Sequence, residues 1–167
     1  VYIRSLSPDN FVQRSLPFLN SGLPPEIKRP LSVDYIRDVL PLIQERAKTL
    51  VEVPELTQFF FISELSYESS LLIVKKMNQE LATKALETSL KRLEELPVSD
   101  EESLETTLRP LAEELELKTG QLFGTLRVAV TGRTVAPPLF QTMTVLGKEC
   151  CLKRMREAIT RLHRLQK

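Results

Sequence analysis

Cationic side chains are the residues best suited to bind a ligand in this sequence, and they gather towards its C-terminal end. Residues 121–167 contain nine Lys and Arg residues against two acids, which leaves 14 basic and 20 acidic residues in the other 120. Such an uneven distribution favours an anionic partner for the C-terminal part. The candidate contacts to phosphate groups are Lys148, Lys153, Arg154 and Arg156.

Motifs for bond-making chemistry are missing from the sequence. It contains no Gly-rich phosphate loop and no nucleophile–histidine motif. Cys150 and Cys151 are adjacent, which disfavours a disulfide between them, and the lone His163 leaves too few ligands for a zinc site. We therefore expect no catalytic residue, no metal and no cofactor in this chain, and unpaired cysteines indicate a cytoplasmic protein. His163 is interpreted as a solvated or packing residue.

Composition predicts an all-α protein. Five glycines and 6% aromatic residues make a β-sandwich or a Rossmann-type domain a poor candidate, whereas 42% hydrophobic residues suffice for a buried core. The longest apolar run, residues 59–62, falls far short of the roughly 18 residues of a membrane span, so no membrane is expected as a partner. We interpret its three phenylalanines as core residues.

Capping residues and apolar periodicity divide the chain into helices. Ser7 and Ser32 are predicted N-caps, Ser99 with Glu102 forms a predicted capping box, and Gly132 is a predicted left-handed C-cap. Pro17, Pro41 and Pro110 lie inside helical patterns, where they are expected to end or kink the helix. The predicted helices begin at residues 8, 33, 54, 67, 80, 100, 119, 138 and 148. A junction at residues 62–66 divides them into two small helical subdomains, 1–64 and 65–167.

Two stretches of the sequence resemble the C-terminal region of bacterial-type glutamyl-tRNA synthetases, which are class I aminoacyl-tRNA synthetases. Residues 126–140, LRVAVTGRTVAPPLF, and residues 145–149, VLGKE, are similar to the signature of the last domain of that family. Residues 2–7 and 17–19 resemble the segment that leaves its stem-contacting domain. The resemblance covers the whole chain and is dense only at 126–149.

The resemblance implies a helical cage that binds the anticodon loop of tRNA(Glu). Arg127 lies where the family has an anticodon-contacting arginine, and residues 136–139 lie where it holds an anticodon base through backbone and apolar contacts. Ala136 and Pro138 depart from family members that have a hydroxyl and an amide donor nearby. The predicted anticodon-binding residues are Arg46, Arg127, Thr131, Arg133, Ala136, Pro137, Pro138 and Leu139.

Arg46 lies where discriminating members of the family have an arginine that faces the third anticodon base. A guanidinium can donate to both adjacent acceptors on the pairing edge of cytosine, whereas the pairing edge of guanine shows mainly donors. The tRNAs for Glu and Gln differ by C and G at that base, so one arginine predicts a preference for tRNA(Glu). A shift of one helical turn would transfer this role to Arg37 or Lys48.

Other interpretations of the same residues stay open. Arg127 could pair with an acid on a neighbouring helix, and Arg46 could be an ordinary solvated residue. The basic final helix could balance the acidic helices before it, in which case the chain would be a helical protein–protein interaction module with a basic C-terminal face.

The resemblance also implies what surrounds this chain. It begins at Val1 without a methionine, as a domain excised from a longer chain would. A full-length synthetase would join glutamate to tRNA(Glu) with ATP and Mg²⁺ on a Rossmann-type catalytic domain, whose motifs are absent here. The expected partners are the tRNA(Glu) anticodon loop and that catalytic domain, and the expected state is a monomer.

Overall fold

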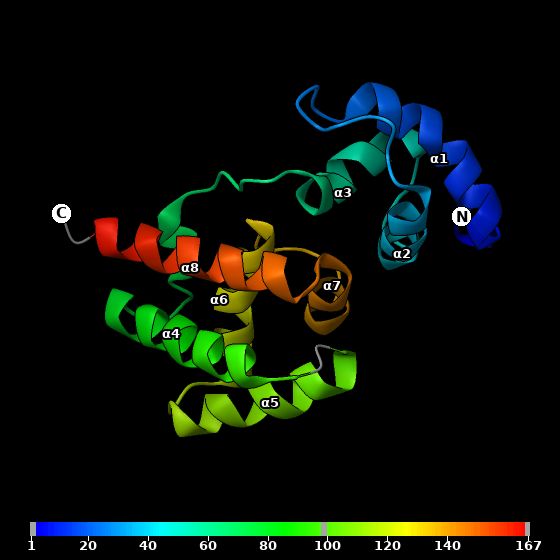
Figure 1. Cartoon of the computed structure of the whole chain (residues 1–167). Helices are drawn as coiled ribbons and strands as arrows, with labels where there is room; N and C mark the ends of the chain where they lie inside the picture. The colour runs from blue at the N-terminus through cyan, green and yellow to red at the C-terminus, as the bar shows by residue number, and fades with distance from the viewer. Residues whose placement is uncertain (1–2, 98–99, 166–167) are drawn as a thin grey trace. The chain divides into compact units, whose positions relative to one another are not determined.

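The computed structural model describes residues 3–97 and 100–165 of the chain. Across these residues it contains helices and no β-strand, which confirms the predicted all-α fold class. The α-helices are α1 Pro8–Gly22, α2 Val33–Ile43, α3 Val53–Phe61, α4 Gln79–Glu95, α5 Glu101–Glu114, α6 Thr119–Thr131, α7 Leu139–Leu146 and α8 Lys148–Leu165 (Figure 1). Three short 3-10 helices accompany them: η1 Ile3–Ser5, η2 Leu50–Glu52 and η3 Ser69–Leu72.

The chain divides into two compact units, Val1–Ser63 (unit 1) and Glu64–Lys167 (unit 2). The sequence predicts this boundary between residues 64 and 65, one residue further along the chain. Unit 1 contains α1 to α3 and unit 2 contains α4 to α8.

Unit 1 is held together by the apolar faces of its three α-helices. Phe11 and Leu19 of α1 are fully buried with Ile36 and Ile43 of α2. Gly22, at the end of α1, allows the close approach of α3, because a Cβ atom there would lie 2.6 Å from Cγ of Pro54. The three consecutive phenylalanines belong mainly to the core, as predicted, since Phe59 and Phe60 are buried.

Local sequence signals correctly predict the starts of the first two α-helices. The Ser7 side chain accepts a hydrogen bond of 3.3 Å from the backbone N–H of Asn10, and the Ser32 side chain accepts one of 3.3 Å from that of Tyr35. Both bonds satisfy a donor that the first helical turn leaves without a partner.

Internal prolines do not end their helices. Pro17, Pro41 and Pro110 lie inside α1, α2 and α5, and each of these helices continues beyond its proline. A proline costs one backbone hydrogen bond. Burial of the apolar residues on either side offsets that cost, because each of these helices packs one face into a core.

Helix α6 runs through unit 2 and contacts α4, α5, α7 and α8, while α4 and α8 pack against each other (Figure 1). Leu122, Leu126 and Ala129 of α6 are fully buried, as are Leu86 of α4 and Met155 of α8. Helix α8 therefore lies against both α4 and the helix that carries Arg127.

Two predicted helix starts in unit 2 differ from the structure. Only η3 forms where a helix is predicted from residue 67, because the hydroxyl of Thr125 donates to the carbonyl oxygen of Leu72 at 2.9 Å and Lys76 has a φ of 69°. A helical ladder cannot continue through a left-handed residue. Ser99, the predicted cap of the next helix, lies outside the described residues, and Asp100 caps α5 by accepting from the N–H of Ser103 at 2.7 Å.

Candidate nucleic-acid interface

Helix α6 presents Arg127 on its partly exposed side. Its neighbours Leu126 and Val128 are buried, whereas Arg127 is only partly covered. Within residues 3–97 and 100–165, no ion pair or hydrogen bond of its guanidinium to another side chain is present. The structure therefore gives no support to the alternative in which Arg127 pairs with an acid on a neighbouring helix. Its N–H donors are available to a ligand.

The end of α6 is fixed by a tight turn at residues 131–133. Thr131 is 2% exposed, and its hydroxyl donates to the carbonyl oxygen of Arg127 at 2.6 Å. The hydroxyl oxygen of Thr131 in turn accepts from the backbone N–H of Arg133 at 3.1 Å. Gly132 has a φ of 73°, as predicted for a left-handed C-cap. Thr131 thus orients the backbone that carries Arg127 and is too buried to offer its own side chain to RNA.

The loop that follows exposes only some of its predicted contact residues. Ala136, Pro137 and Leu139 are buried, whereas Pro138 is exposed. Val135, which is not among the predicted contact residues, belongs to this loop and is 73% exposed. Ala136 and Leu139 therefore position the loop, whereas the side chains of Thr134, Val135 and Pro138 are exposed.

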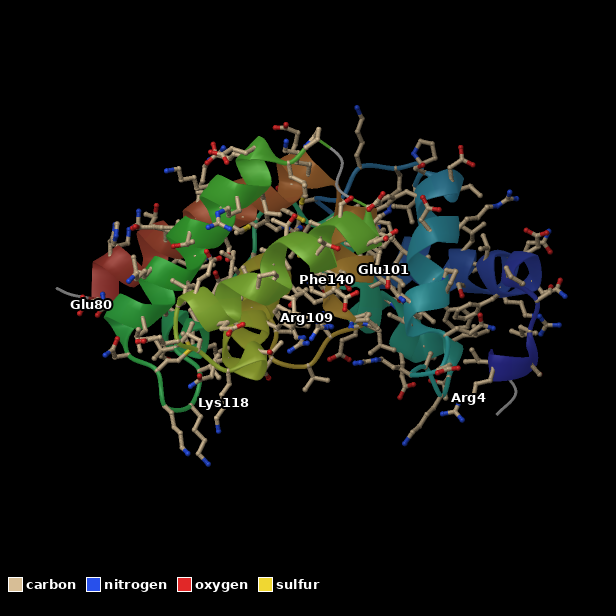
Figure 2. All side chains as sticks on the ribbon, turned by 90° about the horizontal axis from the view of Figure 1, so that it is seen from below. Arg4, Glu80, Glu101, Arg109, Lys118 and Phe140 are labelled. Atoms are coloured by element: carbon tan, nitrogen blue, oxygen red, sulfur yellow. The ribbon has the colours of Figure 1, made fainter. Side chains whose placement is uncertain are left out.

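An arginine and two aromatic rings meet close to Arg127. The guanidinium of Arg109 lies 5.5 Å from the ring centroid of Phe123, and the rings of Phe123 and Phe140 meet edge to face at 5.1 Å (Figure 2). Phe123 lies one turn before Arg127 on the same side of α6. The three residues come from α5, α6 and α7, so the sequence alone could not bring them together. Guanidinium and aromatic planes of this kind stack well on unpaired bases.

Arg154 is a correction to the predicted phosphate contacts. Its side chain is 2% exposed, and its Nη1 donates to the carbonyl oxygen of Val130 at 2.6 Å. That carbonyl belongs to the last turn of α6, where carbonyl groups have no partner within the helix. The positive end of Arg154 therefore satisfies α6 inside unit 2 and is not presented to an RNA backbone.

The other three predicted phosphate contacts lie at the surface, and each already forms a hydrogen bond or an ion pair within the chain. Nζ of Lys148 donates to the carbonyl oxygens of Glu94 at 3.3 Å and Leu96 at 2.9 Å, and so caps the end of α4. Arg156 pairs with Glu94 at 3.3 Å, and Lys153 approaches Glu157 at 3.9 Å. Exposed pairs of this kind contribute little energy and can exchange for phosphate.

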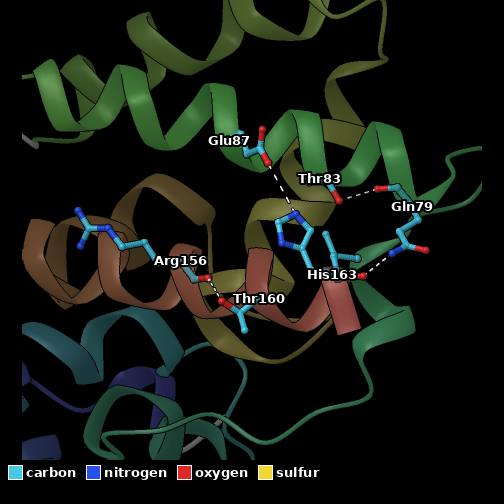
Figure 3. Close-up of polar contacts among 7 residues, drawn as sticks. Gln79, Thr83, Glu87, Arg156, Thr160 and His163 are labelled. Atoms are coloured by element: carbon cyan, nitrogen blue, oxygen red, sulfur yellow. Dashed lines mark hydrogen bonds and ion pairs between the residues drawn. The ribbon is translucent and has the colours of Figure 1, made fainter. Parts of the chain in front are cut away.

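The side of α8 that faces α4 makes polar contacts with that helix. His163 lies 3.9 Å from the carboxylate of Glu87, and Gln79 donates to the carbonyl oxygen of Leu162 (Figure 3). His163 is exposed and pairs at the surface, in agreement with its interpretation as a solvated residue. This side of α8 thus contributes to packing within unit 2.

In unit 1, Arg46 lies in the turn after α2 and not on the helix itself. Helix α2 ends at Ile43, and the backbone N–H groups of Arg46 and Ala47 both donate to the Ile43 carbonyl oxygen at 3.0 Å. The Arg46 side chain is exposed, and among the described residues it has no ion-pair partner. Arg37, an alternative for its role, lies 3.8 Å from Asp9.

Residues outside the predicted site brace this turn. The guanidinium of Arg4 donates to the carbonyl oxygen of Glu45 at 3.1 Å and 3.3 Å (Figure 2). The Gln44 amide donates to the carbonyl oxygens of Ile3 at 2.8 Å and Leu6 at 2.9 Å. The turn that carries Arg46 is therefore held by the N-terminal segment.

The Glu52 carboxylate holds the other side of this turn. It accepts from the backbone N–H groups of Lys48 at 2.7 Å and Thr49 at 3.1 Å, and these two bonds lower the pKa of Glu52. The carboxylate stays ionised at neutral pH and fixes the segment that follows Arg46.

Three further features of the described residues concern metal binding, membranes and thiol chemistry. Among them, no group of three or more His, Cys, Asp or Glu side chains is arranged to hold a metal ion. No described helix is both long and apolar enough to span a bilayer. Burial raises the pKa of Cys151 to about 12, so this thiol stays protonated and unreactive near neutral pH.

Comparison with known proteins agrees with the all-helical fold. Residues 10–159 match the family described as "Anticodon binding domain". The chain therefore belongs to this family of RNA-binding domains.

Two relatives narrow the assignment within this family. The chain is 51% identical over 162 residues to a glutamate–tRNA ligase of Dehalococcoides mccartyi and 46% identical over 161 residues to one of Roseiflexus castenholzii. These alignments cover 97% and 96% of this chain but only 33% and 32% of the relatives. The sequence thus corresponds to the anticodon-binding domain of glutamate–tRNA ligases and spans about a third of the relatives that it matches.

A solved structure supports the fold alone. The structure of a glutamate tRNA ligase from Elizabethkingia meningosepticum in complex with its amino acid matches 95% of this chain and 30% of its own, with a TM-score of 0.78 and 19% sequence identity. The all-helical architecture is therefore shared with that enzyme.

Proposed function

We propose that this chain binds the anticodon loop of tRNA(Glu) as the RNA-recognition part of a glutamate–tRNA ligase. The observation that carries the proposal is Arg127, a partly exposed guanidinium without an acidic partner among the described residues, on a helix whose end is fixed by Thr131 and Gly132. A side chain that contacts a base benefits from a rigid support, because less conformational entropy is then lost when the RNA binds.

The surface around Arg127 suits unpaired bases. Val135 and Pro138 are exposed apolar groups of the loop that follows α6, and the guanidinium of Arg109 lies over the ring of Phe123. Bases in RNA loops are commonly read by such stacking together with hydrogen bonds to their edges. Arg133 completes the proposed contact set. Lys148, Lys153 and Arg156 remain proposed phosphate contacts, which would add affinity without sequence information.

Unit 1 supplies the proposed reader of the third anticodon base. Arg46 is exposed on a braced turn, and its guanidinium can donate to both acceptors of cytosine. A two-donor contact of this kind discriminates by roughly 1–3 kcal/mol, a factor of about 5 to 150 in affinity. Lys48 and Arg37 are the residues that would take this role if the register differs by one turn.

The chemistry of the full-length ligase would belong to a catalytic domain outside this chain. We propose that it uses ATP and Mg²⁺ to attach glutamate to tRNA(Glu), in the cytoplasm, and that this chain acts as a monomeric part of it. Anticodon binding would then contribute by positioning the distant acceptor end, which uses binding energy from a remote part of the substrate.

The test is a binding titration with a fluorescently labelled tRNA(Glu) anticodon stem-loop. Arg127→Ala is expected to weaken binding by about 5- to 150-fold, since one good base contact contributes roughly 1–3 kcal/mol. Lys91→Ala is the matched control, because Lys91 is an exposed cation on α4 and its replacement removes the same charge.

Two results would count against the proposal. Equal affinities of the Arg127 and Lys91 variants would mean that the chain attracts RNA by charge alone. No binding of the stem-loop by the unmodified chain would favour a protein-interaction module instead. Circular dichroism of each variant must show unchanged helix content.

A further inference from the structure

Three lysines from distant parts of the sequence lie together at the start of α6. Lys75 and Lys76 belong to the turn between η3 and α4, and Lys118 immediately precedes α6. The side-chain amide of Gln121 joins the two segments: its Oε1 accepts from the backbone N–H of Lys118 at 2.8 Å, and its Nε2 donates to the carbonyl oxygen of Lys75 at 3.1 Å. All three lysines are exposed and belong to unit 2. We call Lys75, Lys76 and Lys118 the lysine cluster.

The turn that carries two of these lysines packs closely on α6. A Cβ atom at Gly124 of α6 would lie only 3.0 Å from Cγ2 of Val74. The turn is closed by the backbone N–H of Met77, which donates to the carbonyl oxygen of Val74 at 2.9 Å. Lys76 within it has a φ of 69°, a left-handed conformation that costs free energy for any residue with a Cβ atom and that glycine adopts readily. A cationic side chain thus occupies a position where the backbone alone would favour glycine.

The ammonium groups of the lysine cluster are not neutralised by the chain itself. Over the part of the chain that the structure describes, no ion pair involves any of the three. In contrast, Lys148 caps α4, and Lys153 and Arg156 have acidic partners. The acid nearest to the cluster along the chain is Glu116, which is exposed and lies two residues before Lys118. A cation without a partner can bind a phosphate group without first breaking an ion pair, so the lysine cluster is better suited to this role than the cations of α8.

Helix α6 connects the lysine cluster to the proposed base-contacting residues. Lys118 precedes its first turn, and Arg127 lies about 14 Å further along the helix axis. A groove between α5 and the start of α6 is lined by Lys118 and by Arg109, which belongs to the arginine–aromatic group near Arg127 (Figure 2). Two acids also line this groove, Glu113 and Glu105, and Glu105 pairs with Arg109 at 2.7 Å. An RNA whose bases contact Arg127 would therefore have the cluster within reach of its neighbouring nucleotides.

We propose that the lysine cluster binds phosphate groups of the same RNA, outside the anticodon bases. The proposal rests on the proposed function. A lysine ammonium group acts on phosphate as a point charge, and such contacts add affinity and salt dependence without sequence information. The 120 residues before the basic C-terminal part contain 14 basic and 20 acidic residues, so a count of charges along the sequence does not reveal this cationic surface.

The experiment is a set of anisotropy titrations of the whole 167-residue chain with the tRNA(Glu) anticodon stem-loop at several salt concentrations. The double variant Lys75→Gln with Lys118→Gln is expected to bind at least about fivefold more weakly at low salt, and its slope of log affinity against log salt concentration should be smaller by about two. Ratios of affinity between stem-loops that differ at one anticodon base should change by less than about twofold, because phosphate contacts do not distinguish bases. Lys84→Gln with Lys91→Gln is the matched control, since both are exposed lysines of α4 and the change in charge is the same.

A variant of the third lysine separates loss of binding from loss of folding. Lys76→Gly removes the charge and also the cost of a left-handed residue with a Cβ atom, so its thermal midpoint should not fall. Its RNA affinity should nevertheless decrease, with a slope smaller by about one. Glu116→Gln should have the opposite effect and strengthen binding, because it removes the acid nearest to the cluster along the chain. A single-stranded oligonucleotide with the loop sequence alone identifies which phosphates are bound: loop phosphates if the double variant weakens both RNAs, and stem phosphates if it weakens only the stem-loop.

Three results would overturn the proposal. If the cluster variants bound the stem-loop no more weakly than the control variant, the lysine cluster would not contact RNA, while the proposed function would stand and an acidic protein surface would become the better partner. If they changed the ratios between anticodon bases, the cluster would contact bases and not phosphates. If the unmodified chain bound no stem-loop at any salt concentration, the proposed function and the role of the lysine cluster would fall together.

Discussion

Replacement of Arg154 by methionine should destabilise unit 2 and leave the electrostatic attraction to RNA almost unchanged. The guanidinium is 2% exposed and donates to the Val130 carbonyl oxygen at 2.6 Å. Methionine keeps most of the apolar stem but cannot donate. The variant therefore leaves a buried carbonyl without this donor, at a cost of about 1–3 kcal/mol. Because little packing volume is lost, we expect a total loss near 2 kcal/mol.

Urea unfolding followed by circular dichroism measures this loss, together with RNA titrations at several salt concentrations. With a denaturant dependence of about 1–3 kcal/mol per molar urea, the midpoint should fall by about 1 M. Arg156→Met is the control, because Arg156 is exposed on the same helix. It should change the free energy of unfolding by less than about 0.5 kcal/mol. The slope of log affinity against log salt concentration should fall by about one, as expected for the loss of one phosphate contact. If Arg154→Met also left the stability almost unchanged and lowered the salt dependence of RNA binding, the buried position of Arg154 would be refuted.

Two further predictions concern unit 1 and the start of α5. Arg46→Gln should narrow the affinity difference between stem-loops with C and G at the third anticodon base, and an undiminished preference would remove Arg46 from the site. Asp100 accepts from the N–H and side chain of Ser103, which lowers its pKa, so its stabilising effect is present above the unfolded-state pKa and is lost as the pH falls through the lowered folded-state value. Asp100→Ala should therefore lower the thermal midpoint at pH 7 and make little difference at a pH below both values; an equal difference at both pH values would contradict this.

Local interactions explain which parts of the fold the sequence could predict. Ser7 and Ser32 cap helices through hydrogen bonds that span three residues. Glycine is favoured where a helix ends in a left-handed residue, as α6 does at Gly132. These features depend on neighbouring residues only. For the same reason the helix starts were predictable within one or two positions.

Features that depend on distant residues could not be predicted. Arg154 and Arg156 look alike in the sequence, and only the packing of α8 against α6 makes one buried and the other exposed. The helix predicted from residue 67 is replaced by η3, because Thr125, far along the chain, bonds the Leu72 carbonyl oxygen.

The predicted anticodon-binding site also has features that the sequence identifies and features that depend on tertiary contacts. The motif around Arg127 identified the helix and loop, but the sequence could not tell that Thr131 and Ala136 are buried supports while Val135 is exposed. Tertiary contacts likewise bring Arg109 from α5 to Phe123.

The most direct test of the account is the affinity of the unmodified chain for two anticodon stem-loops, one of tRNA(Glu) and one with G in place of C at the third anticodon base. The titrations should be run at two salt concentrations, because phosphate contacts make affinity strongly dependent on salt. The account predicts salt-dependent binding to both and an affinity about 5 to 150 times higher for the C form, with a ratio that changes little with salt. Equal affinities would contradict discrimination at the third anticodon base by Arg46, and no binding of either form would contradict recognition of the anticodon by this chain.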